Sequence, residues 1–201
     1  MHHVVRHAGA LLCLVSLSAA GAGAQQASAS DACWIRGAPA NLAKRPSKLD
    51  SASVTLGSNT VKVCYGSPQK RGRKIMGGLV PYGQPWRMGA NEATTIHVPV
   101  RARIAGVAVQ PGWYSLYAVP GEREWRIVVN SQAQRWGIPI DSTVQRADVG
   151  SGTVPMHETP SVVEALTEHF ESTGSSSANL VVEWDRAAVR IPVVLEAASS
   201  N

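Results

Sequence analysis

The sequence lacks every short motif that would identify a chemistry by itself. It contains no G-x-S-x-G nucleophile elbow, no H-E-x-x-H helix, no EF-hand loop and no G-x-x-x-x-G-K-[ST] phosphate loop. It also has few charged residues, 16% of the chain, with a net charge of only +5. This mild excess is far from the clustered basicity of a nucleic-acid binder, so we expect no nucleic-acid partner.

No apolar run in the chain is long enough to span a bilayer. The longest, from Ala8 to Ala20, follows a weakly basic start and precedes the small residues Ala22-Gly23-Ala24. This is the layout of a secretory signal peptide with an A-x-A cleavage site. We therefore expect residues 1–24 to be removed, the protein to be exported to the periplasm or outside the cell, and no transmembrane segment to remain.

Cysteine is scarce, with three residues in the whole chain. Cys13 lies inside the apolar run, which leaves Cys33 and Cys64 after cleavage. An oxidising compartment allows these two to form a disulfide, which on the chain-entropy model stabilises the fold by roughly 3 to 4 kcal/mol. The alternative is a thiol pair for metal or redox chemistry, but the chain has no C-x-x-C spacing to support it.

Turn and strand signals divide the remaining chain. Residues 25–50 are small, polar and interrupted by two prolines, so we expect an extended N-terminal arm. Residues 51–196 carry many short alternating segments between Gly and Pro turns, and residues 197–201 form a tail. These signals predict one all-β domain, an antiparallel, jelly-roll-like β-sandwich of about ten short strands.

Two regions of this domain have weaker signals. The segment from Ser161 to Phe170 has the composition of a helix, with Ser161 as a possible N-cap and Glu164 three residues later. Thr143 to Val149 is a weak strand candidate. Asp185 and Arg186 are expected to form a tight connection between the last two strands. Alternation in the first of these strands places Leu180, Val182 and Trp184 on one face.

The longest irregular segment, Gly66 to Ala93, is rich in glycine, proline and basic residues and has neither helical nor strand periodicity. A loop this long inside a compact domain is usually functional or disordered, and its apolar and aromatic content argues against disorder. Guanidinium groups and flat rings suit an anionic or carbohydrate-like ligand. The candidate ligand-binding residues are Arg73, Lys74, Tyr82, Trp86, Arg87, Asn91 and Glu92. Alternatively, the apolar residues of the loop plug one end of the sandwich.

Evidence for catalysis is thin. Glu92, with His97 nearby, is a weak candidate for hydrolysis, since glycoside hydrolases use carboxylates. An ion pair with Arg87 or Arg73 is the simpler interpretation, because cations outnumber acids in this loop. The histidines have no characteristic ligand spacing, so we expect no metal and no cofactor.

Several segments resemble, in the same order, the bacterial exported family catalogued as domain of unknown function 2911. They are Val61–Gly66, Arg71–Lys74, Gly77–Gly83, Trp86–Glu92, Pro111–Leu116, Pro120–Gly121, Trp125 and Leu180–Trp184. The resemblance runs from about Ser51 to Val194. It implies a single, mostly β domain with a signal peptide and no established activity. It also implies an extended strand from Glu164 to Glu171, so we expect strand rather than helix there.

With no complete catalytic set, the sequence favours a non-catalytic binding or accessory module of the cell envelope, whose partner is an unknown envelope ligand or protein. A hydrolase acting on an envelope polymer, and a structural or protein-interaction domain, are the alternatives.

Overall fold

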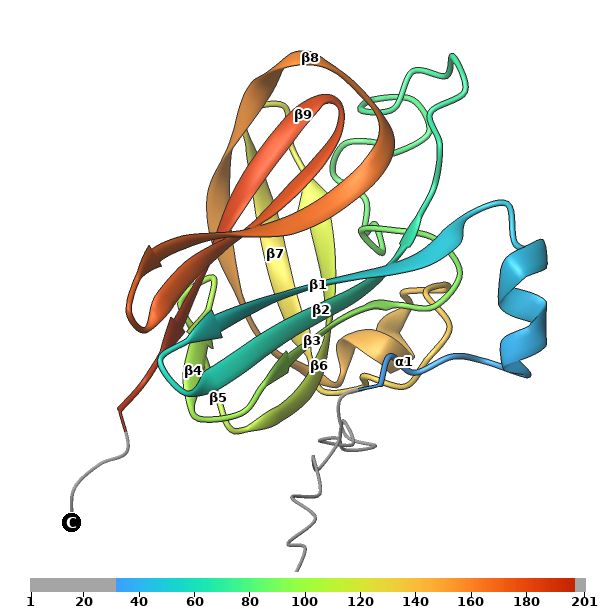
Figure 1. The fold of residues 1–201 in the computed structure, drawn as a ribbon. Coiled ribbons are helices and arrows are strands. Elements are labelled where there is room, and N and C mark those ends of the chain that lie inside the picture. Colours follow the sequence, from blue (N-terminus) through green and yellow to red (C-terminus); the bar gives the residue numbers. More distant parts are fainter. Residues whose placement is uncertain (1–31, 198–201) are drawn as a thin grey trace, which may run out of the picture.

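The computed structural model describes residues 32–197 (Figure 1). The expected signal peptide, the start of the N-terminal arm and the end of the tail lie outside these residues. Among residues 32–197, no helix has the length and apolar character needed to cross a membrane.

Nine strands, one short 3₁₀ helix and one short α-helix make up the described chain. They are η2 (Pro39–Lys44), β1 (Lys48–Leu56), β2 (Asn59–Ser67), β3 (Thr94–Val98), β4 (Ala102–Ile104), β5 (Val107–Val109), β6 (Gly112–Pro120), β7 (Glu124–Asn130), α1 (Ser142–Gln145), β8 (Asp148–Gly174) and β9 (Ser177–Leu195). The prediction of an all-β antiparallel domain is confirmed. The number and length of the strands differ from the prediction, because β8 and β9 are long and continuous.

All nine strands belong to one antiparallel sheet, in the order β1-β2-β3-β6-β7-β8-β9-β4-β5. Only three residues separate Val98 of β3 from Ala102 of β4, so the two residues are at most about 14 Å apart. In a flat sheet, the five strand spacings between β3 and β4 would separate them by about 24 Å. The sheet must therefore fold back on itself, and Figure 1 shows β8 and β9 curving over the other strands.

β8 makes this fold possible because it pairs with different strands along its length. Its first part, Asp148 to Pro155, pairs with β7, and its remainder pairs with β9. The register shifts between Glu158, Val163 and Thr167, where the strand bends. Within the bend, an isolated bridge joins Gln69, just after β2, to Ala165. The start of the long loop is thereby held against the middle of β8.

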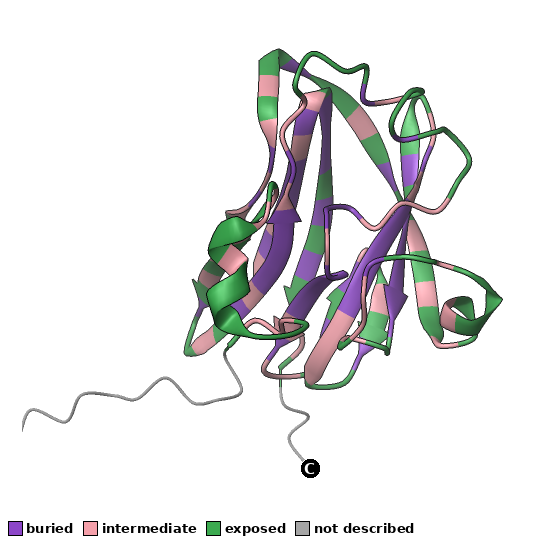
Figure 2. Ribbon diagram, turned by 90° about the vertical axis from the view of Figure 1, so that its right-hand side faces the viewer, coloured by how far each residue is buried: buried purple, intermediate pink, exposed green. Residues whose placement is uncertain are grey.

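The hydrophobic core lies between the facing parts of the folded sheet, and the buried residues in Figure 2 follow the inner faces of the strands. The expected alternation on β9 is confirmed, since Leu180, Val182 and Trp184 are all buried. The largest fully buried side chains are Trp125, Trp184, Ile75, Met88, Ile96, Ile104, Leu116, Ile127, Leu166, Leu180, Ile191 and Glu168.

Glu168 is the exception among these core residues. It is 2% exposed, and neither carboxylate oxygen has a hydrogen-bond partner among the described residues. Burial raises the pKa of Glu168 well above its ordinary value. Burial also raises the pKa of the neighbouring Tyr65 to about 12, and the Tyr65 hydroxyl donates to Asp50 at 3.4 Å. Burial without a partner therefore favours the neutral form of the Glu168 carboxyl group.

The predicted disulfide between Cys33 and Cys64 is confirmed, with the two Cα atoms 5.8 Å apart. It joins the N-terminal arm to β2. The arm is not fully extended, because Pro39 begins the 3₁₀ helix η2, as expected for proline at the first position of a helix. β1 begins at Lys48, three residues before the predicted start of the domain.

Three local predictions are decided by the structure. The expected strand from Glu164 to Glu171 is confirmed as part of β8. The strand expected from Thr143 is wrong, because Asp141 caps a helical turn by accepting from the N–H groups of Thr143 and Val144. The tight connection expected at Asp185 is also wrong: Asp185 has a positive φ of 58° and β9 continues through it.

Candidate functional site

The long loop from Gly66 to Ala93 is held against the sheet by close backbone contacts. A Cβ atom on Gly66 would lie 2.0 Å from the carbonyl oxygen of Ala90, so only glycine allows this approach. The hydroxyl of Thr94 donates to the carbonyl of Met88 at 3.0 Å. Met88 is fully buried with a φ of 56°, a conformation that non-glycine residues adopt only when the surrounding structure imposes it.

The middle of the loop also joins the sheet. Trp86 and Ala118 of β6 exchange two backbone hydrogen bonds, of 2.7 and 2.9 Å. The ring of Trp86 packs face to face with that of Trp184 of β9, with the ring centroids 6.1 Å apart. It packs edge to face with Trp125 of β7, with the centroids 5.6 Å apart. Three tryptophans from the loop and two strands thus form one aromatic cluster.

A groove of about 450 Å³ lies on one side of this cluster. Trp86 contributes aromatic surface and the almost fully buried Trp184 lies in the wall beside it, and the cations along the groove are Arg71, Arg73 and Arg87. The other lining residues are Pro46, Ser47, Pro68, Gln69, Leu79, Val80, Pro85, Gly89, Ala90 and Ile138. No acidic residue lines the groove. The groove therefore combines apolar surface with positive charge only.

The three arginines have no carboxylate within ion-pair distance among residues 32–197. Nε of Arg87 donates to the carbonyl of Gly89 at 3.0 Å, and burial lowers the pKa of Arg87 from its ordinary value. Nε of Arg73 donates to the carbonyl of Lys70 at 2.8 Å. Guanidinium groups fixed by backbone carbonyls and lacking a carboxylate retain donors for an anionic ligand.

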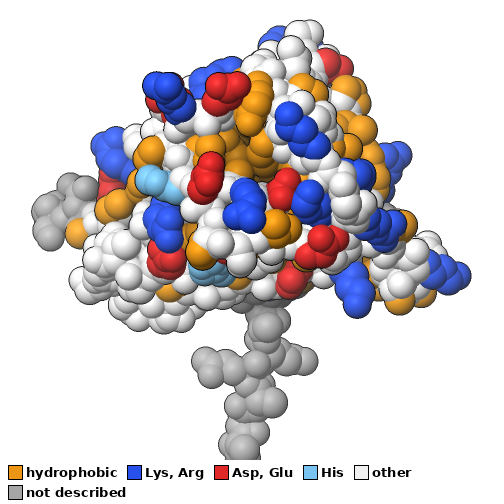
Figure 3. Space-filling view, turned by 90° about the horizontal axis from the view of Figure 1, so that it is seen from above, with side chains coloured by type: hydrophobic (Ala, Val, Ile, Leu, Met, Phe, Trp, Pro, Cys, Tyr) orange, Lys and Arg blue, Asp and Glu red, His pale blue; other side chains and the backbone are white. Residues whose placement is uncertain are grey.

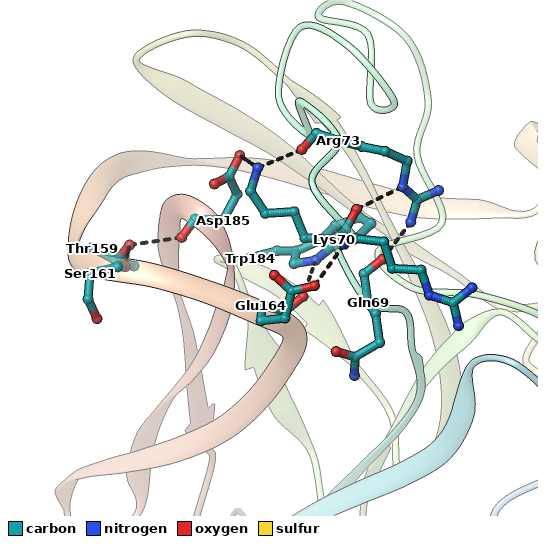
Figure 4. A network of polar contacts seen from close by, with 9 residues as sticks. Gln69, Lys70, Arg73, Thr159, Ser161, Glu164, Trp184 and Asp185 are labelled. Atoms are coloured by element: carbon teal, nitrogen blue, oxygen red, sulfur yellow. Dashed lines mark hydrogen bonds and ion pairs between the residues drawn. The ribbon is translucent and has the colours of Figure 1, made fainter.

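A polar network behind the groove fixes this geometry (Figure 4). The Glu164 carbonyl accepts from the backbone N–H of Lys70 at 2.7 Å and from the indole of Trp184 at 3.3 Å. The Glu164 carboxylate accepts from the backbone N–H of Arg71 at 2.7 Å. Nζ of Lys70 lies 3.4 Å from a carboxylate oxygen of Asp185 and also donates to the carbonyl of Arg73. One residue of β8 therefore positions both a loop backbone and a groove tryptophan.

The structure separates the predicted ligand-binding residues into three places. Arg73, Trp86 and Arg87 line the groove, whereas Lys74 and Tyr82 line a second, smaller cavity. Asn91 and Glu92 line neither. The amide of Asn91 instead donates to the carbonyl of Ser47 at 3.0 Å.

Glu92 forms an ion pair, as the balance of charges predicts, but its partner is Arg45 at 2.7 Å rather than Arg87 or Arg73. The backbone N–H of Arg36 donates to the other carboxylate oxygen at 2.8 Å. Burial alone would raise the pKa of Glu92, but the hydrogen bonds from Arg45 and Arg36 hold it below its ordinary value. These contacts are those of a structural anchor for the arm.

His97, the other candidate for hydrolysis, lies on β3, and the centroid of its ring is 5.0 Å from that of Trp113.

Several groove residues were not among the candidates from the sequence. Pro46 and Ser47 come from the arm, and Trp184 from β9. Trp184 was predicted only as a core residue of its strand. No local sequence pattern predicts that the arm and β9 meet at the loop.

Surface hydrophobic side chains also occur on this end of the molecule. Figure 3 shows them between scattered Lys or Arg and Asp or Glu side chains. Leu79 is 48% exposed and Tyr82 38%, whereas Ile75 and Val80 of the same loop are buried. The loop thus closes part of the core and also presents apolar surface. In the described part of the chain, no group of three or more His, Cys, Asp or Glu side chains is placed to hold a metal ion.

Comparison with known proteins identifies a family but no activity. The family model described as "Protein of unknown function (DUF2911)" matches residues 47–193. No curated protein and no solved structure gives a significant match. The match covers most of the chain, including the loop, the groove arginines and all nine strands except the last two residues of β9.

Proposed function

The chain belongs to the DUF2911 family, and on this premise we propose that it is a non-catalytic binding module whose groove holds an amphipathic anion. The observation that carries the proposal is the groove itself. Arg71, Arg73 and Arg87 line it together with the aromatic side chains, and none of the three forms an ion pair with a carboxylate among residues 32–197. A ligand with an apolar face and a carboxylate or phosphate group would use both kinds of surface.

The compartment, partner and scaffold that we propose for this module are those expected from the sequence. We propose export to the periplasm or beyond, a ligand or protein partner in the cell envelope, and a jelly-roll-like sandwich as the rigid scaffold. The disulfide between Cys33 and Cys64 supports an oxidising compartment. A hydrolase that uses Glu92, or a purely structural domain, would not require three arginines around an open groove.

The proposal is tested by titrating the purified protein with three anions that differ in their apolar part: trigalacturonate, a muramyl peptide and lysophosphatidate. Binding is followed by tryptophan fluorescence, because Trp86 and Trp184 line the groove. At least one probe should bind, and Arg71→Gln or Arg87→Gln should weaken it about 10- to 100-fold, which corresponds to one lost charge-assisted contact. Lys44→Ala is the matched control, since Lys44 lies on η2 and does not line the groove.

Binding that is unchanged in both arginine variants would contradict the proposal. Failure of all three probes would contradict it as well. Turnover of any probe that is lost in Glu92→Gln would show that the hydrolase alternative is correct.

A further inference from the structure

A second cavity, of about 210 Å³, lies between the long loop and strands β7, β8 and β9. It shares no lining residue with the groove. Neighbouring residues divide between the two, since Arg73 and Trp184 line the groove while Lys74 and Asp185 line the second cavity. The second cavity is therefore a separate place for a ligand.

The charges of this cavity are of both signs, unlike those of the groove. Lys74 and Arg186 are cationic, and Glu158 and Asp185 are acidic. Asp185 is paired with Lys70, but Lys74, Arg186 and Glu158 have no ion-pair partner within residues 32–197. Two cations and one carboxylate at the same cavity thus remain without a counter-charge in contact.

The remaining wall of the cavity is apolar. Met76 of the loop and Met156 of β8 contribute flexible thioethers, which adapt to the shape of an apolar group. Trp125 of β7 contributes an indole that is 1% exposed, and its Nε1 has no hydrogen-bond acceptor among the described residues. The volume lies below the range of about 300 to 1,000 Å³ that is usual for drug-sized ligands, so the cavity suits a smaller molecule.

We propose that this cavity binds a free α-amino acid with an apolar side chain. The carboxylate would lie toward Lys74 and Arg186, the ammonium group toward Glu158, and the side chain against the methionines and Trp125. A simple anion would bring its charge close to Glu158 and Asp185, and a simple cation would meet Lys74 and Arg186. Only a ligand with both charges satisfies both signs in so small a space.

Isothermal titration of the purified protein with L-methionine tests this inference directly. The same titration is done with L-methioninamide, which lacks the carboxylate, and with 4-(methylthio)butanoate, which lacks the amino group. L-methionine should bind, and each analogue should bind at least tenfold more weakly because one charged contact is lost. Absence of binding at 10 mM L-methionine, or equal binding of either analogue, would overturn the proposal.

Variants locate the site. Lys74→Ala, Arg186→Gln and Glu158→Gln should each weaken L-methionine binding about tenfold or more. Lys44→Ala should leave it unchanged, and so should Arg71→Gln, because Arg71 lines only the groove. All five positions are exposed, so folding is expected to be preserved. L-methionine binding that is lost in Arg71→Gln but retained in the Lys74 and Glu158 variants would place the amino acid in the groove and refute the second site.

Discussion

Nη1 of Arg45 lies 2.7 Å from a carboxylate oxygen of Glu92, across 47 residues of sequence. The side chains of the pair are only 16% and 6% exposed. The guanidinium groups of Arg45 and Arg36 also lie over the ring of Trp136, each 5.8 Å from its centroid. Together with the disulfide, this cluster fastens the arm to the loop, and the arm supplies one wall of the groove.

Glu92→Gln should destabilise the protein by about 2 kcal/mol, because it leaves Arg45 without its charged partner. The folded pKa of Glu92 is lowered, so the stabilisation is present above the ordinary value of 4.5 and is lost as the pH falls through the folded pKa. Urea unfolding at pH 7 and at pH 3 should therefore show a smaller loss on acidification in the variant than in the wild type. Glu122→Gln, at an exposed turn position, is the control. An equal acid dependence of all three proteins would refute this role.

Glu168 predicts the opposite pH dependence. Its folded pKa is raised, so its contribution is most favourable below the unfolded value of 4.5 and is lost as the pH rises toward the folded pKa. Glu168→Leu removes a buried carboxyl group without partners and should stabilise the protein by about 1 to 3 kcal/mol at pH 8. The gain should be smaller at pH 4. Thermal unfolding at pH 4 and at pH 8 measures the gain. Tyr65 does not interfere, because both pH values lie well below its pKa of about 12.

A Glu168→Leu variant less stable than the wild type at pH 8 would mean that the carboxyl group has a partner after all. Glu168→Gln separates the two explanations, because it keeps the shape and hydrogen-bonding capacity but cannot ionise. Its stability should change less between pH 5 and pH 8 than that of Glu183→Gln, a control on β9 that retains Glu168.

Glu164→Ala should loosen the loop backbone at Arg71, since its carboxylate accepts from the Arg71 N–H. Hydrogen exchange of this amide should become about five- to tenfold faster, as expected for one lost hydrogen bond of about 1 kcal/mol. Glu164→Gln keeps an acceptor oxygen and should restore slow exchange. Amide exchange followed by NMR checks this without any ligand. Equal exchange in the Ala and Gln variants would show that the side chain does not hold the loop.

Gly66→Ala should destabilise the fold by about 3 kcal/mol or more, because its Cβ would lie 2.0 Å from the carbonyl oxygen of Ala90. Gly72→Ala is the matched comparison. Gly72 has a φ of 69° and no atom within 4 Å of its Cβ position, so it isolates backbone strain of about 1 kcal/mol. Denaturant unfolding should give Gly66→Ala a clearly smaller free energy of unfolding than Gly72→Ala. The reverse order would mean that Ala90 moves away at little cost.

Residues whose environment is decided locally were predictable. Leu180, Val182 and Trp184 share a face by alternation alone, and all are buried. Cys33 and Cys64 were the only pair available. The cap at Asp141 also had a local signal, an Asp followed by Ser and Thr, but the β-branched residues after it favoured a strand.

Contacts distant in sequence could not be predicted in this way. Arg45 and Glu92 meet only because the arm returns to the loop, so the sequence suggested nearer arginines. Glu168 is polar on a strand where the core needs apolar residues, and nothing local distinguishes it from its exposed neighbour Glu164. Arg73 and Lys74 were assigned to one surface, but they line different cavities.

The pairing of β4 with β9 also constrains when this chain can fold. Ala102 pairs with Leu195, so the hairpin of β4 and β5 has no neighbour in the sheet until the last strand has been synthesised. Non-local strand pairing of this kind slows folding, because loop closure precedes the contacts that compensate for it. A nascent chain that has not yet reached Val193 would therefore still lack one edge of its sheet, and its core would stay incomplete until synthesis is almost finished.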